Sequence, residues 1–176
     1  MSLDESQRLG AGVRYTHGEA IPAPGAAIEV AEGILWFRLP LPLKLDHVNI
    51  YALDDGDSWT IVDTGFQSEA SYEAWETALN GPLKGKPVKR VVVTHHHPDH
   101  IGLAGWFKEE HGAEIYATRT AWLTARLMIS EDSDAAFEAQ IQHMTRAGAP
   151  EEMIELSRKR RGFFGGFVHP LTPGFK

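Results

Sequence analysis

The spacing of apolar residues changes along this chain, and the change divides it into regions. Up to residue 118, short apolar runs rich in β-branched residues alternate with stretches of helical spacing. The helical spacing predicts one helix at 68–79, which Ser68 can cap, and another at 103–111. The apolar runs predict strands at 27–39 (a pair hinged at Glu32 and Gly33), 48–53, 59–62, 88–94 and 114–117.

Strands that alternate with helices are typical of an α/β layer, in which helices cover one face of a mixed sheet. In the first strand pair we take Ile34, Trp36 and Leu39 as the residues that face the core. After residue 118 no strand is predicted, and three helices follow, at 120–130, 133–148 and 150–161. We therefore divide the chain into an irregular arm at 1–25, an α/β unit at 26–118, a helical block at 119–161 and an apolar, glycine-rich tail at 162–176.

Composition and charge narrow the classes of function. The 176 residues carry a formal net charge of −7, which argues against nucleic acid or an anionic membrane as a partner. There is no cysteine, so disulfides and thiolate metal sites are excluded. The first residues lack a signal pattern and no apolar run is long enough to span a bilayer. We therefore expect a cytoplasmic protein that acts on a small molecule.

The densest chemistry lies at residues 90–102, RVVVTHHHPDHIG, where three histidines follow an apolar strand without a spacer. Alternation along an extended chain sends His95 and His97 to one side and His96 to the other. His95 and His97 can therefore bind one metal ion together. A solvated, histidine-rich loop is the alternative interpretation, and the H-x-H-x-D-H spacing after a buried strand disfavours it.

Asp99 and His100 come after a turn that Pro98 stiffens, and they point from a different direction. A carboxylate oxygen and an imidazole nitrogen suit a second ion, with zinc, manganese or iron as the candidates. Two neighbouring ions can share a water and lower its pKa, so a metal-bound hydroxide could hydrolyse an ester, lactone, amide or phosphodiester. Asp99 would then be both a ligand and the catalytic orienting group. Iron in the same ligands would instead support oxygen-dependent chemistry.

These residues resemble the metallo-β-lactamase-fold superfamily, whose signature is T-H-x-H-x-D-H after a buried strand. The resemblance implies His95 and His97 as ligands of a first metal and Asp99 and His100 as ligands of a second, with two zinc ions in the complete site. The sequence TIVDTG resembles the family's strand ending in D-T-G, whose aspartate, here Asp63, supports the metal loop. The family fold is a four-layer αββα sandwich of two similar halves. The length of this chain corresponds to the first half and a helical extension, which in relatives roofs the active-site mouth.

The resemblance also implies ligands that this sequence lacks. The family takes a third histidine, a bridging aspartate and a last histidine from downstream motifs, and none of these motifs occurs before Lys176. His169 is a weak candidate for the third histidine, and His47 a weak candidate for substrate contact. We expect an incomplete site, a tail that packs on something beyond Lys176 and an apolar sheet face that favours a homodimer. A non-catalytic half-domain that needs a partner is the alternative to an enzyme.

Overall fold

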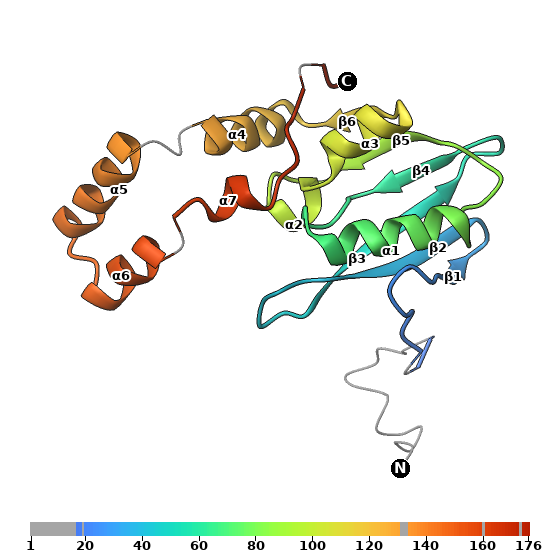
Figure 1. The fold of residues 1–176 in the computed structure, drawn as a ribbon, viewed down its shortest axis with the longest axis horizontal. Helices are drawn as coiled ribbons and strands as arrows, with labels where there is room; N and C mark the ends of the chain where they lie inside the picture. Colours follow the sequence, from blue (N-terminus) through green and yellow to red (C-terminus); the bar gives the residue numbers. More distant parts are fainter. Residues whose placement is uncertain (1–16, 19, 131–133, 160, 173) are drawn as a thin grey trace, which may run out of the picture.

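The computed structural model describes residues 17–18, 20–130, 134–159, 161–172 and 174–176. Its described strands form one sheet, in which the order of the strands follows their order in the chain (Figure 1). Strands β1 to β4 pair antiparallel, whereas β4, β5 and β6 run parallel. The strands are β1 (Ile28–Ala31), β2 (Ile34–Pro40), β3 (His47–Asp54), β4 (Trp59–Val62), β5 (Val88–Val93) and β6 (Glu114–Ala117).

Helices α1 (Glu69–Asn80) and α3 (Ala104–His111) cover one face of this sheet (Figure 1). Helix α1 begins as predicted, because the Ser68 side chain accepts a hydrogen bond from the Ser71 N–H. Between sheet and helices lies a core in which strand and helix residues are almost fully buried, including Phe37, Ile50, Ile61, Trp75, Val91, Phe107 and Ile115. The predicted α/β class, a mixed sheet with helices on one face, is therefore confirmed, and it corresponds to half of a four-layer sandwich.

The core-facing residues of the first strand pair differ from the prediction. Phe37 and Leu39 are 1% exposed, whereas Ile34 and Trp36 lie on the opposite face of the sheet and are only half-buried. The pairing of β2 with β3 determines which residues of β2 face the core, because it places Phe37 opposite the buried Ile50. The prediction was right for Leu39 and wrong for Ile34 and Trp36. Leu35, Phe37 and Leu39 are all apolar, whereas Ile34 and Trp36 share their side of the strand with Arg38, so the alternation in the sequence favoured the observed orientation.

The other face of the sheet carries a cross-strand row that no described helix covers. Residues directly opposite one another on neighbouring strands point to the same face. Tyr51 and Val92, in the middle of the row, are 37% and 36% exposed. We call this row the open sheet face, and its members are Ile28, Trp36, Tyr51, Val62, Val92 and Tyr116.

Four helices follow the sheet: α4 (Arg119–Ser130), α5 (Asp134–Arg146), α6 (Glu151–Lys159) and the short α7 (Phe163–Gly166). The first three match the predicted helices, although the predicted start at Ser133 lies outside the described residues, and α7 was not predicted. Helices α5 and α6 extend to one side of the α/β layer (Figure 1). Within the described part of the chain, no helix combines the length and hydropathy needed to cross a membrane.

The tail packs against its own α/β layer, which differs from the expectation that it would pack on something beyond Lys176. The ring of Phe167 stacks on Phe66, with ring centroids 4.5 Å apart, and the His169 N–H donates to the Gly102 carbonyl over 2.7 Å. A Cβ atom at Gly102 would lie 2.7 Å from the Phe167 carbonyl oxygen and 2.3 Å from that of Gly65. Glycine is therefore needed at 102 for the tail to lie this close.

Candidate metal centre

The candidate site forms where two parallel strands end side by side. Strand β4 ends at Val62, which lies opposite Val92 near the end of β5. Asp63 and Thr94 therefore follow their strands at the same edge of the sheet. The short helix α2 (Pro98–Ile101) begins soon after, with proline at its first position, where a missing N–H costs nothing. A rigid strand and a helical turn thus hold the histidine loop between them.

Asp63 is the buried acceptor that joins these elements. Its side chain is almost buried, and its carboxylate accepts hydrogen bonds from the Thr94 N–H (2.8 Å) and the Thr94 hydroxyl (2.7 Å). The second oxygen also accepts from Nδ1 of His100 over 2.7 Å. The backbone of Asp63 has φ 63°, in the left-handed region, which aspartate tolerates better than most residues. Asp63 therefore ties the end of β4 both to β5 and to α2.

Thr64 is a further support, and sequence reasoning did not single it out. Its hydroxyl donates to the His100 carbonyl (2.9 Å) and accepts from the Leu103 N–H (3.0 Å). Its own N–H donates to the same His100 carbonyl (2.8 Å). The only signal in the sequence was its place in the D-T-G motif. Thr64 fixes the backbone of α2, and through it the position of the His100 ring.

Four side chains were predicted as metal ligands. The structure brings three of them, His95, His97 and His100, into one cluster. Nε2 of His95 and Nδ1 of His97 lie 3.0 Å apart. The rings of His95 and His100 have centroids 4.0 Å apart, whereas the His95 and His96 centroids are 6.4 Å apart. Nε2 of His100 lies 3.3 Å from Oδ2 of Asp99, so these two donors also face each other. The His96 ring lies against His97, with centroids 4.9 Å apart, and is the one farthest from His95 among these rings.

Burial and hydrogen bonding shift the pKa values of the residues in this cluster in different directions. Burial alone would lower the pKa of His100, but hydrogen bonds to Asp63 and Asp99 outweigh it and raise this pKa to about 9. The hydrogen bond from His100 lowers the pKa of the Asp99 carboxyl. Burial, followed by the nearby His100 and His97, lowers the pKa of His95. At neutral pH the metal-free cluster therefore holds a neutral His95 beside a charged His100 and an ionised Asp99.

The imidazole nitrogens and the carboxylate of this cluster are of the kinds that bind metal ions, although few of them are available to any one ion. Two imidazole nitrogens bound to one tetrahedral zinc ion at about 2.0–2.1 Å are roughly 3.3 Å apart. The 3.0 Å between His95 Nε2 and His97 Nδ1 is close to that separation. Among the described residues, however, no group of three or more His, Asp or Glu side chains is arranged to hold an ion. The loop thus presents donors in pairs.

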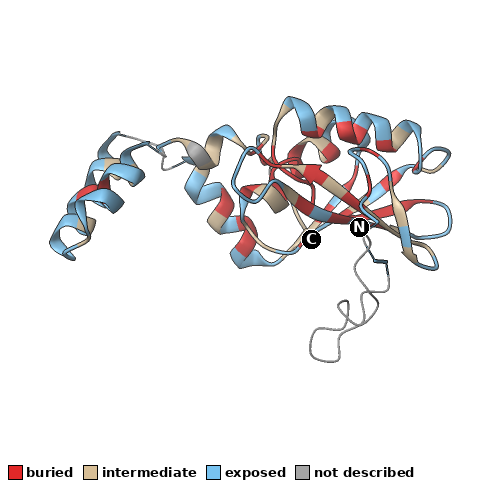
Figure 2. Ribbon diagram, turned by 90° about the horizontal axis from the view of Figure 1, so that it is seen from below, coloured by how far each residue is buried: buried red, intermediate tan, exposed pale blue. Residues whose placement is uncertain are grey.

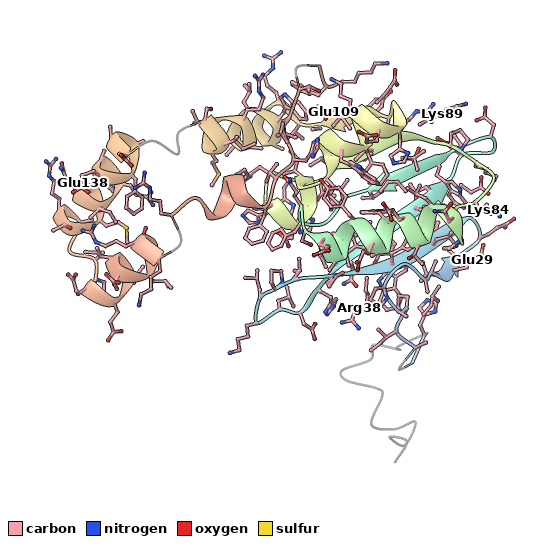
Figure 3. All side chains as sticks on the ribbon, in the orientation of Figure 1. Glu29, Arg38, Lys84, Lys89, Glu109 and Glu138 are labelled. Carbon is pink, nitrogen blue, oxygen red and sulfur yellow. The ribbon has the colours of Figure 1, made fainter. Side chains whose placement is uncertain are left out.

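The two weaker candidates have partners elsewhere. His169 donates or accepts through Nδ1 to the Tyr72 hydroxyl (3.2 Å) and pairs through Nε2 with Glu109 (2.9 Å), which α3 supplies (Figure 3). Both of its ring nitrogens therefore face side chains of α1 and α3. His47 begins β3 at the edge of the sheet where β4 ends, and its Nδ1 lies 2.6 Å from Asp46 and also contacts Arg38.

Comparison with known proteins gives a consistent picture. The model of the Metallo-beta-lactamase superfamily matches residues 43–170, well over half of the chain. Among solved structures, a beta-lactamase domain protein from Burkholderia ambifaria is 34% identical with a TM-score of 0.74, and the match covers 92% of this chain and 45% of that one. A metallo-beta-lactamase family protein from Thermus thermophilus is 31% identical with a TM-score of 0.63, covering 83% of this chain and 46% of that one.

Curated proteins match over a shorter region. The probable metallo-hydrolase YqjP of Bacillus subtilis (strain 168) is 34% identical over 80 residues, which are 45% of this chain and 25% of YqjP. The probable metallo-hydrolase YybB of the same organism is 37% identical over 81 residues, or 46% of this chain and 34% of YybB. The chain thus spans less than half the length of each of these four proteins.

Proposed function

Because the chain belongs to the metallo-beta-lactamase superfamily, a family of metal-dependent hydrolases, we propose that it forms the metal-loop half of a hydrolase that uses zinc. The observation that carries this proposal is the pair of imidazole nitrogens 3.0 Å apart at the end of β5. The α/β half-domain at 26–118 holds this pair, and the helical block at 119–161 stands beside it as a cap. The substrate classes are those with a hydrolysable ester, lactone, amide or phosphodiester bond.

We assign one role to each donor. His95 and His97 hold a first ion, and Asp99 with His100 holds a second. Bound zinc supplies Lewis acidity, which polarises a substrate oxygen and lowers the pKa of water. Asp99, with its lowered pKa, stays ionised at neutral pH and orients the attacking group.

The surrounding residues of the chain keep these donors in place. Asp63 accepts a hydrogen bond from Nδ1 of His100. Nε2 of His100 is therefore the ring atom that faces Asp99 and would bind a metal. Thr64 holds the His100 backbone, because its hydroxyl donates to the His100 carbonyl. Because both supports lie in the buried D-T-G segment, the orientation of His100 is set by the core of the α/β layer.

The proposal also predicts that this chain alone is a poor enzyme. A zinc site takes about four donors, and each pair described above supplies two. We therefore expect residues 1–176 to bind zinc weakly and to turn over neither ester nor lactone. Calorimetric titration with zinc and a hydrolysis assay on the same sample test this. Two tightly bound ions with steady turnover would show that the ligand count is wrong, and no zinc binding at all would refute the metal centre.

We also propose that a second copy of the chain covers the open sheet face. Tyr51 and Val92 stand exposed in its middle, and apolar faces of this kind are normally buried against another surface. Sedimentation velocity should show a dimer that Val92→Lys dissociates. The control Glu73→Lys, at an exposed position of α1, should leave the dimer intact. A wild-type monomer at all concentrations would contradict this proposal without affecting the metal centre.

A further inference from the structure

A pocket of about 650 Å³ opens between the histidine loop and the helical block. The loop contributes His97 and Pro98, so the pocket begins at one of the proposed zinc ligands. A volume of this size lies within the range of roughly 300–1,000 Å³ that is usual for small-molecule sites. The helical block and the first residues of the tail contribute the other lining residues: Met128, Ala136, Phe137, Gln140, Met153, Leu156, Ser157 and Arg161 from the block, and Gly162, Phe164 and Gly165 from the tail.

The larger part of the pocket wall is apolar, although Gln140, Ser157 and Arg161 add polar groups. Met128, Met153 and Leu156 are 43%, 56% and 47% exposed, so their side chains remain available for contact with a ligand. Phe137 and Phe164 add aromatic surface. Methionine side chains are flexible and fill irregular spaces, so they can pack against a flexible apolar chain.

Charge is nearly absent from the lining. Apart from His97 at the mouth, Arg161 is the one ionisable residue among those that line the pocket. Arg161 bonds to Asp134 and lies over the Phe137 ring, 5.1 Å from its centroid. Its charge is therefore already matched by a carboxylate. An uncharged, apolar group fits these walls better than an ion does.

We propose that the pocket binds the apolar acyl chain of an ester substrate, with the ester carbonyl at His97. This inference rests on the proposed hydrolase function, since it names the substrate class of the same site. Hydrolysis joins the oxygen of one water to the acyl carbon and breaks the bond from that carbon to the ester oxygen. The alcohol leaves with one proton of the water, and the acid retains or releases the other. No further reactant is needed.

The inference can be tested without metal or catalysis, by calorimetric binding of octanamide and acetamide to the EDTA-treated chain. These neutral amides carry a long and a short acyl chain. We expect the affinity to rise by roughly threefold to fourfold for each methylene that enters the pocket. Octanamide should therefore bind far more tightly than acetamide.

Two adjacent glycines of α7 provide a matched pair of variants. Gly165 lines the pocket and Gly166 does not, and a Cβ atom added at either one meets nothing within 4 Å. Gly165→Phe should fill the pocket and weaken octanamide binding at least about tenfold, whereas Gly166→Phe should change it less than about twofold. Met153→Ser, at an exposed position of the wall, should also weaken binding.

The outcomes separate this inference from the proposed function. Equal octanamide affinity in Gly165→Phe, Met153→Ser and wild type, or equal affinity for the two amides in wild type, would overturn the acyl pocket. Zinc binding at the loop would still stand in that case. If zinc fails to bind while octanamide binding depends on Gly165, the pocket stands as an apolar ligand site and the hydrolase proposal falls.

Discussion

Between its sheet and the helices α1 and α3, the α/β layer buries its apolar side chains almost completely, whereas α5 and α6 leave much of their surface in solvent (Figure 2). Helix α1 alone buries four residues, but α5 and α6 bury one each, Ile141 and Ile154. Metal donors must be held within fractions of an ångström, and the donors that we propose come from the densely packed region. The loosely packed region lines the pocket that we propose for an acyl chain, where exposed side chains such as Met153 can adapt to a ligand.

The difference in packing between the two regions can be tested by removing one large side chain from each and comparing the losses in stability. Trp75 is fully buried, donates from Nε1 to the Thr64 carbonyl (2.8 Å) and packs edge-on against Phe107. Trp75→Ala should lower the free energy of unfolding by about 3–5 kcal/mol, since it leaves a cavity and an unpaired carbonyl. Leu123→Ala, at an exposed position of α4, should lower it by less than about 0.5 kcal/mol. Urea denaturation measures both, and similar losses would contradict the contrast.

The second prediction concerns the support that the α/β layer gives to the donors. Asp63→Asn keeps a residue that tolerates a positive φ but removes the negative charge beside His100. Zinc retention should fall about ten- to a hundred-fold while the chain stays folded. Asp57→Asn is the control, because Asp57 pairs with Lys89 at an exposed turn of the same layer. Unchanged zinc retention in Asp63→Asn would leave Asp63 as a strand-end residue only.

The third prediction follows from the raised pKa of His100. Because this pKa is raised from 6.5 to about 9, the charged ring stabilises the metal-free fold fully below pH 6.5, and this contribution is lost as the pH rises through about 9. Zinc must displace a proton from His100, so its apparent association constant should rise about tenfold per pH unit from pH 7 toward 9. Zinc titrations across this range test it. An affinity that does not change with pH would remove His100 from the ligand set.

The same contrast explains how much could be predicted from the sequence. Local patterns were sufficient for α1 and β6, and for the position of the histidine loop, because capping residues and β-branched runs act over a few positions. The histidine pair was also readable, since alternation needs only the strand before it. These features lie in the densely packed region, where local preference and tertiary packing agree.

Features that depend on distant partners could not be predicted in the same way. The fold-back of the tail was set by the stacking of Phe167 on Phe66. The positive φ of Asp63 and the three hydrogen bonds that join Thr64 to His100 and Leu103 arise only when the end of β4 meets α2 and the residues after it. The pocket needed α4, α5, α6 and α7 to be placed beside the start of α2. Of the apolar residues in the helical block, Trp122 and Ile141 became core, while Met128 and Phe137 line the pocket.

The central claim is that His95 and His97 form a zinc-binding pair, and the loop contains its own control. His96 lies between them in the sequence, but its ring centroid is 6.4 Å from that of His95. Zinc content and zinc affinity should be measured for His95→Ala, His97→Ala and His96→Ala under identical conditions. We predict at least about a tenfold loss of affinity in the first two and wild-type affinity in the third. Equal loss in all three variants, or no loss in any of them, would contradict the proposed metal centre.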